Sequence, residues 1–229
     1  YNAGLEIKNK IIETKKVICD ALGATFNDNL IFTGSATEAN NLAIFGSIKI
    51  GSMKKGEQLI FGQGEHPSVY NCAQELKARG YDVKFLPLMQ DGVVDLDKLK
   101  EFLDQPTAFV SIMHVSNETG AINDIAKIAK MIRQKHPDCI FHCDGVQAFG
   151  KIPVNLTNLG VDLYTISSHK LGGPKGIGAL YAKNLKKLKP IVFGGEQEYG
   201  LRSGTENTSY ILAFGEVVKN LNIDKDFEK

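Results

Sequence analysis

One lysine stands out because of its neighbours. Lys170 lies between His169 and a glycine-rich stretch in "TISSHKLGGPKGIGALY", residues 165–181, directly after an apolar run typical of a buried strand. A primary amine held at the end of a strand can condense with an aldehyde. A single lysine is far more often a solvated surface cation. Lys175 is the competing amine, but it lies inside the glycine turn, so the strand-end position favours Lys170.

The stretch "TGSATEANN" has the pattern of a phosphate site at a helix start. Ser35 and Glu38 are three apart, as in a capping box, which predicts a helix from Ala36. The free N–H groups and positive dipole of a helix N-terminus attract phosphate, and Thr37 adds a hydroxyl. An ordinary capped helix is the alternative. Two further phosphate donors follow a later strand: Ser167 and His169.

Three other polar groups also follow apolar runs. Asp144 and Gln147, in "CDGVQAFGK", lie where a strand passes into a helix, so the carboxylate can hold a proton on a heteroaromatic ring nitrogen. His66, in "GEHPSV", can stack on an aromatic ring or carry a proton. Asn117 lies in the loop "SNETG". Taken singly, the alternatives are helix caps for Asp144 and His66 and a turn for Asn117.

The stretch "GGEQEYGLRSGTEN" combines a guanidinium with hydroxyls around a glycine, which suggests an anion-binding loop of Arg202, Ser203 and Thr205. A surface turn is the alternative. Together with the groups above, the set matches what pyridoxal phosphate requires, namely a lysine for its aldehyde, an acid for its ring nitrogen and anchors for its phosphate.

The cysteines and the remaining histidines have simpler interpretations. Cys139 and Cys143 bracket "CIFHC", where a metal site is conceivable, but the segment has the pattern of a buried strand and we expect both in the core. His114 and His142 lie inside apolar strands, and we expect them in the core too. His136 precedes a proline at a helix end. No metal is expected.

The elements that must position these groups alternate between short apolar runs and amphipathic segments. Helical spacing predicts a helix over 5–22, ended by Gly23, with Ile7, Ile11, Ile18 and Leu22 on one helical face. Alternating strands and helices predict an α/β fold with a mainly parallel sheet, and ligands bind such sheets beyond the carboxyl ends of the strands. The expected strands are 30–33, 58–62, 82–87, 107–115, 139–143, 162–167, 178–182 and 190–193.

Composition excludes several classes of partner. With 27 Lys and Arg against 26 Asp and Glu, the net charge of +1 gives no field for direct binding of nucleic acid or an anionic membrane. No apolar run reaches the length of about 20 residues that a membrane helix needs. Four scattered cysteines in 229 residues favour a reducing compartment, and we expect the cytoplasm.

The motifs "TGSATEANNLAI", "GEHPSV", "HVSNETGAI", "HCDGVQAFGKIPV", "SSHKLGGPKGIGALY" and "GGEQEYGLRSGTEN" resemble those of NifS/IscS-type cysteine desulfurases, which are class V aminotransferase enzymes that use pyridoxal 5′-phosphate. The resemblance spans nearly the whole chain in the family's order and spacing. It implies a fold type I large domain, with a mixed, mainly parallel seven-stranded sheet between helices. It also implies conversion of L-cysteine to L-alanine with formation of an enzyme-bound persulfide.

By this resemblance, Lys170 bonds to the cofactor aldehyde, and His66 stacks on the ring and is the second catalytic residue. The resemblance also gives the other contacts: Asp144 with the ring nitrogen, Gln147 and Asn117 with the phenolic oxygen, Thr37, Ser167 and His169 with the phosphate, and Thr205 with the phosphate of a partner subunit. A homodimer is therefore implied, as is a sulfur acceptor such as an iron–sulfur scaffold or a tRNA-thiolation protein.

We expect residues 1–229 to be the cofactor-binding large domain, because the family's N-terminal segment and C-terminal small domain have no counterpart in the chain. The small domain carries the family's nucleophilic cysteine and the arginine that binds the substrate carboxylate. Two alternatives stay open at this point: another class V enzyme, such as a selenocysteine lyase or an aminotransferase, and a domain that binds the cofactor without catalysis.

Overall fold

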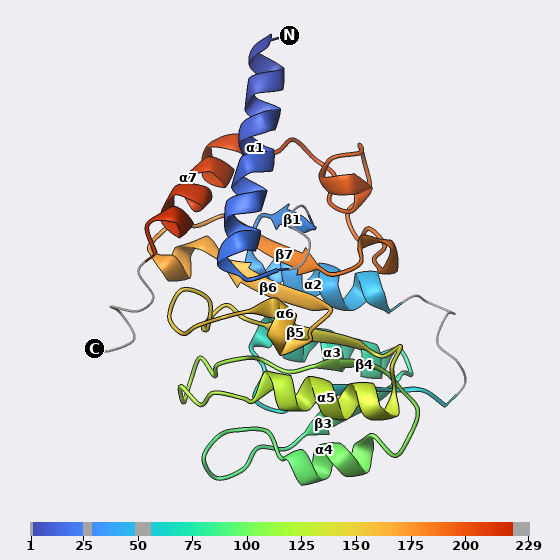
Figure 1. The fold of residues 1–229 in the computed structure, drawn as a ribbon. Helices are drawn as coiled ribbons and strands as arrows, with labels where there is room; N and C mark the ends of the chain where they lie inside the picture. Colours follow the sequence, from blue (N-terminus) through green and yellow to red (C-terminus); the bar gives the residue numbers. More distant parts are fainter. Residues whose placement is uncertain (1, 25–28, 49–55, 222–229) are drawn as a thin grey trace.

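Seven strands form the central sheet of the computed structural model, which describes residues 2–24, 29–48 and 56–221 (Figure 1). Their order is β1-β7-β6-β5-β4-β2-β3. Strand β7 runs antiparallel to both of its neighbours, and the other adjacent pairs are parallel. The predicted mixed, mainly parallel sheet is thus confirmed. The strands are β1 (Leu30–Thr33), β2 (Gln58–Gly62), β3 (Asp82–Leu86), β4 (Thr107–Ser111), β5 (Ile140–Asp144), β6 (Leu163–Ser167) and β7 (Gly178–Ala182).

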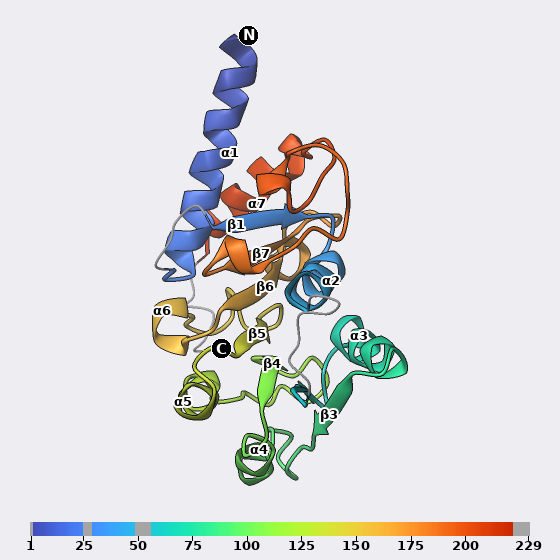
Figure 2. The same ribbon diagram turned by 90° about the vertical axis from the view of Figure 1, so that its right-hand side faces the viewer.

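Helices cover both faces of the sheet, as the turned view shows (Figure 2). One core lies under α2 and α3 and the other under α1, α4, α5, α6 and α7. Successive side chains of a strand enter opposite cores, as Ile31 and Phe32 do. The helices are α1 (Asn2–Ala21), α2 (Ala36–Ser47), α3 (Pro67–Ala78), α4 (Leu96–Phe102), α5 (Ile125–Lys135), α6 (Leu156–Leu159) and α7 (Thr208–Lys219), with short 3₁₀ turns η1 (Ser168–Leu171), η2 (Leu185–Lys187) and η3 (Glu198–Gly200).

Two expected strands differ from the structure. The strand predicted over 107–115 ends at Ser111. The segment 190–193 is not a strand, and its backbone makes only an isolated bridge between Val192 and Arg202. Ile191 packs against the core on the side of α2, but Val192 and Phe193 are 41% and 83% exposed, so the run is not buried as a covered strand would be. The helix predicted over 5–22 is present as α1, but Ile7 is 36% exposed because the first turns of α1 project beyond the sheet (Figure 1).

A buried ion pair joins α1 to the chain that follows β7. The Nζ atom of Lys15 lies 2.8 Å from Oε2 of Glu198, and that oxygen also accepts the backbone N–H of Phe32 at 2.8 Å. The side chains of Lys15 and Glu198 are 8% and 3% exposed. Burial raises the pKa of Glu198, although Lys15 and the N–H of Phe32 lower it. The contact occupies a backbone N–H of edge strand β1.

No helix in the described part of the chain has the length and apolar character needed to cross a membrane.

Candidate functional site

Seven of the nine predicted site residues line a single cavity of about 350 Å³ at the carboxyl ends of the parallel strands. These residues come from segments far apart in the sequence. The strand-end rule for α/β sheets therefore located the cavity correctly. The predicted residues in its lining are Thr37, His66, Asn117, Asp144, Gln147, His169 and Lys170.

The other two predicted residues lie outside this cavity. Ser167 is buried at the end of β6, and its Oγ lies 2.9 Å from Nδ1 of His169, so it contacts the cavity through that imidazole. Thr205 lines a separate cavity of about 130 Å³ together with Gly34 and Arg202. Lys175, the competing lysine, is not part of the lining of the larger cavity.

The start of α2 forms one wall of the cavity. Oγ of Ser35 accepts the backbone N–H of Glu38 at 3.1 Å, which confirms the predicted cap. In a capping box the Glu38 carboxylate would also accept the backbone N–H of Ser35. Here it accepts the N–H of Gly34 instead, at 2.7 Å. The first N–H groups of a helix have no partner inside it, and Ala36 and Thr37 line the cavity. This wall can therefore receive an anion such as a phosphate.

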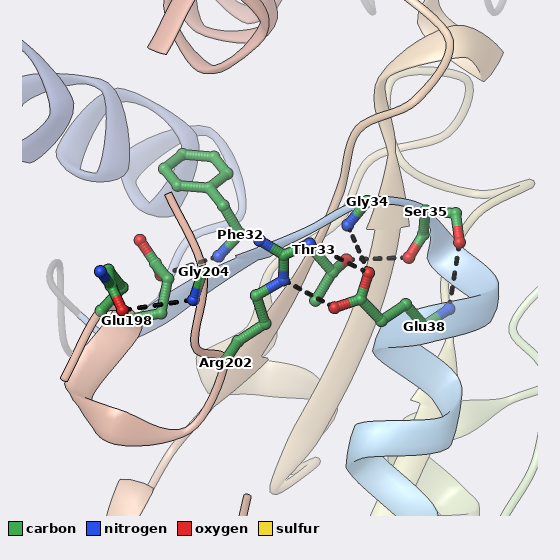
Figure 3. A network of polar contacts seen from close by, with 9 residues as sticks. Phe32, Thr33, Gly34, Ser35, Glu38, Glu198, Arg202 and Gly204 are labelled. Carbon is green, nitrogen blue, oxygen red and sulfur yellow. Dashed lines mark hydrogen bonds and ion pairs between the residues drawn. The ribbon is translucent and has the colours of Figure 1, made fainter. Parts of the chain in front are cut away.

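Arg202 does not supply its charge to this wall. Its Nε donates to Oε1 of Glu38 at 2.7 Å, so the guanidinium is paired (Figure 3). The Ser203 hydroxyl donates to the carbonyl of Gly195 at 2.7 Å. This pairing takes the charge that the anion-binding interpretation of the loop required.

Asp144 ends β5 and is 6% exposed. Oδ1 accepts the N–H of Val146 at 3.0 Å, and Oδ2 accepts the Nδ2 amide of Asn40 at 2.8 Å. Burial raises the pKa of the Asp144 carboxyl, while these two donors and the nearby His66 lower it. No cationic side chain in the described residues forms an ion pair with it, so a protonated ring nitrogen in the cavity would supply its missing counter-charge.

His66 caps α3, as its alternative interpretation predicted, and it also lines the cavity. Pro67 follows at the first helical position, where its missing N–H carries no cost. Nδ1 of His66 accepts the N–H of Ser68 at 3.1 Å. The cap thus fixes the ring at the cavity edge.

A glycine is required beside Asp144. A Cβ on Gly145 would lie 2.0 Å from the ring carbon Cζ of Tyr164, which is fully buried and whose hydroxyl lies 2.9 Å from Nδ1 of His114. We expect Gly145→Ala to lower the free energy of unfolding by about 3 kcal/mol, because the buried ring cannot give way. Chemical denaturation measures this loss. Gly4→Ala is the control, since nothing lies within 4 Å of its new Cβ. A loss below about 0.5 kcal/mol for Gly145→Ala would contradict the packing argument.

The predicted core positions of cysteine and histidine are confirmed. Cys139 and Cys143 are 2% and 0% exposed. Burial raises the pKa of Cys139 to about 12 and that of Cys143 well above its ordinary value. Burial lowers the pKa of His114 to about 4 and that of His142 to about 3. No group of three or more His, Cys, Asp or Glu side chains that could hold a metal ion occurs among the described residues.

Sequence reasoning missed two polar residues that contact the site, Asn40 and Ser68. Asn40 lies three residues after Thr37 on α2, and this spacing puts both on one face of the helix. Ser68 lies in the first turn of α3, two residues after His66. The helical spacing from already chosen residues was the available signal.

Comparison with known proteins places this geometry in a family. Residues 1–229 match the sequence model described as "Aminotransferase class-V". The chain is 40% identical to "Cysteine desulfurase IscS" of Dictyoglomus turgidum over 100% of this chain and 58% of that protein. It is 38% identical to "Cysteine desulfurase, mitochondrial" of Candida albicans over 99% and 46%. The solved structure "SspA in complex with cysteine" superposes with a TM-score of 0.90 at 33% identity, covering 96% of this chain and 63% of that one. The chain thus spans about half the length of the curated relatives it matches.

Proposed function

This chain belongs to the class V aminotransferase family, whose members depend on pyridoxal 5′-phosphate, and from that premise we propose that it forms the cofactor-binding part of a cysteine desulfurase. The proposed reaction takes L-cysteine and an enzyme thiol to L-alanine and an enzyme persulfide. The names of the two desulfurase relatives support this choice. So does the cysteine complex of the structural neighbour.

The observation that carries the proposal is the chemistry of one cavity. Asp144 is a buried carboxylate with no counter-ion among the described residues, and it faces the same cavity as Lys170 and the start of α2. A ring with a protonated nitrogen, an aldehyde and a phosphate has a complementary group for each of them. The residues therefore fit the cofactor.

We assign the holding roles as follows. Lys170 bonds to the aldehyde carbon, Asp144 holds the proton on the ring nitrogen, and His66 stacks on the ring. Oε1 of Gln147 already accepts from Lys151, which leaves the amide N–H groups of Gln147 as its donors to the phenolic oxygen. Asn117 shares that oxygen. The phosphate contacts are Thr37 and His169, with Ser167 behind His169.

When bound, the cofactor withdraws electrons from the substrate Cα. Once the substrate amine has taken its place, the freed amine of Lys170, which lines the cavity, would remove the proton from Cα and return a proton to the product. Burial raises the pKa values of Cys72, Cys139 and Cys143, which keeps these thiols protonated. Since Cys19 is also fully buried, we propose that the thiolate that attacks the substrate sulfur comes from elsewhere in the whole protein.

The remaining assignments concern the whole protein. We propose that residues 1–229 form its large domain and that it is a homodimer in which Thr205, outside the larger cavity, reaches the partner's phosphate. An iron–sulfur scaffold or a tRNA-thiolation protein would accept the sulfur. All four cysteines are buried, which fits a reducing compartment, and we propose the cytoplasm.

An assay of the full-length protein tests the reaction. With pyridoxal phosphate, L-cysteine and a reductant, alanine and sulfide should form in equal amounts. Alanine formed from L-selenocysteine alone would indicate a selenocysteine lyase, and keto-acid formation would indicate an aminotransferase. Cofactor uptake with no product from any of these substrates would indicate a binding domain. Each of these three results would contradict the proposed function.

A further inference from the structure

A chain of three hydrogen bonds connects the Asp144 carboxylate to the His66 imidazole. Nδ2 of Asn40 lies 2.8 Å from Oδ2 of Asp144 and 2.8 Å from Oγ of Ser68. Oγ of Ser68 lies 2.7 Å from Nδ1 of His66. We propose that Asn40 and Ser68 are positioning residues that fix the proton of the His66 imidazole on Nε2. The Asp144 carboxylate decides which atom donates and which accepts in each hydrogen bond of the chain.

In the hydrogen bond between Asn40 and Asp144, Asn40 must be the donor. Both oxygens of Asp144 accept N–H donors, an arrangement that favours the ionised form. An ionised carboxylate only accepts, so the atom of Asn40 that faces it must be Nδ2. The opposite amide orientation would place Oδ1 of Asn40 against the carboxylate. Asn40 is fully buried, and its Oδ1 has no partner within the part of the chain that the structure describes. The amide keeps its orientation at that cost.

The donor role of Asn40 then fixes the roles of the Ser68 hydroxyl. Its Oγ accepts the second N–H of Asn40, so its one O–H is left to donate to Nδ1 of His66. The backbone N–H of Ser68 donates to the same nitrogen at 3.1 Å. Two donors face Nδ1, and a neutral imidazole with an unprotonated Nδ1 carries its proton on Nε2. Nε2 makes no hydrogen bond to any described residue, and His66 lines the cavity.

The consequence for catalysis rests on the proposed function. An imidazole with its proton on Nε2 can donate a hydrogen bond or a proton at that nitrogen but cannot accept one. His66 would therefore meet the cofactor and substrate as a donor. The other histidine and lysine side chains that line the cavity are His169 and Lys170. The proposed function assigns His169 to the phosphate, which leaves Lys170 to remove a proton.

The tautomer can be read without cofactor or turnover. We would label the histidine imidazoles of the full-length, cofactor-free protein with ¹⁵N and record long-range ¹H–¹⁵N spectra, which separate protonated from unprotonated ring nitrogens. His66→Gln assigns the signals. In the unmodified protein we expect His66 to be protonated at Nε2. A proton on Nδ1 overturns the inference, whatever reaction the protein catalyses.

Variants test the two positioning residues. Ser68→Ala removes one of two donors to Nδ1 and should shift the tautomer ratio about 5- to 10-fold toward Nδ1–H, whereas Ser68→Thr keeps the hydroxyl and should retain the original ratio. Asn40→Leu should shift the ratio in the same direction and weaken binding of pyridoxal phosphate about 10- to 100-fold, because Asp144 loses a donor.

Gln58→Leu is the matched control, since Gln58 is a buried amide with two hydrogen bonds at the opposite end of β2. It should leave the His66 ratio unchanged. An unchanged ratio in both Ser68→Ala and Asn40→Leu overturns the positioning role. If Asn40→Leu does not fold, the comparison of Ser68→Ala with Ser68→Thr decides the question. A failed desulfurase assay with the expected tautomer would reject the function and leave the positioning role intact.

Discussion

Lys170→Ala should abolish the visible absorbance band that pyridoxal phosphate shows when it is bound through a lysine amine. It should also lower alanine formation by the full-length protein about 10³-fold or more, because one change removes both the covalent attachment and the proposed base. Spectra recorded during titration with the cofactor, and initial rates of alanine release, measure the two effects. Reduction with borohydride followed by peptide mapping identifies the modified lysine directly.

Lys175→Ala is the matched control, because it removes a lysine five residues along that does not line the cavity. Its absorbance band and rate should match those of the unmodified protein. The cofactor should still bind Lys170→Ala noncovalently, since the wall of α2 and Asp144 remain. An unchanged band in Lys170→Ala, or its loss in Lys175→Ala, would contradict the assignment of Lys170.

Lys15→Met should destabilise the fold by about 3–5 kcal/mol at neutral pH, the usual cost of removing one partner of a buried ion pair. Glu198 would then be a buried carboxylate with only the N–H of Phe32 as its donor in the described structure. The other oxygen of this carboxylate, Oε1, already lacks a hydrogen bond within the described residues. Denaturant unfolding at pH 7.5 measures the loss. The cation–π contact of Lys15 with Tyr199, 4.4 Å from ring centroid to Nζ, would also disappear.

The loss of folding stability in Lys15→Met should depend on pH, and the direction of that dependence can be predicted. The pKa of Glu198 is already raised in the folded protein by burial, and removing Lys15 raises it further. A raised pKa in the folded state favours folding below the ordinary glutamate pKa, and this contribution is lost as the pH rises through the folded pKa. The deficit of Lys15→Met should therefore be largest at neutral pH and shrink as the pH falls toward 4.5. A deficit independent of pH would show that lost packing dominates.

Adding Glu198→Gln to Lys15→Met should recover most of the lost stability. The glutamine oxygen still accepts the N–H of Phe32, but the buried charge is gone. If the double variant is no more stable than Lys15→Met, the unpaired charge is not the cause of the loss.

The sequence predicted those parts of the site that depend on local rules. Asp144, His66 and Lys170 were found because polar groups directly after apolar runs lie at the carboxyl edge of a parallel sheet. The start of α2 was predicted because four consecutive residues, from Ser35 to Glu38, have the pattern of a helix cap. Both signals need only the neighbouring sequence.

The remainder depends on contacts that local sequence does not contain. Arg202 was interpreted as an anion binder because its partner could not be recognised from the sequence. That partner, Glu38, lies 164 residues earlier in the chain. The bond of Asn40 to Asp144 spans 104 residues. The apolar run at 190–193 has a strand-like composition, but whether a helix covers such a run is decided by the tertiary fold. Spatial neighbours of this kind appear only when the sheet is assembled.

The position of β1 has a consequence for biosynthesis. The only described strand that pairs with β1 is β7, which leaves the ribosome roughly 150 residues later. At typical translation rates the early strand waits roughly 10–30 s for that partner. The start of α2, which follows β1 and lines the larger cavity, is not held in its final place during this interval. A nascent chain of this protein should therefore become able to capture its cofactor only near the end of synthesis of this region.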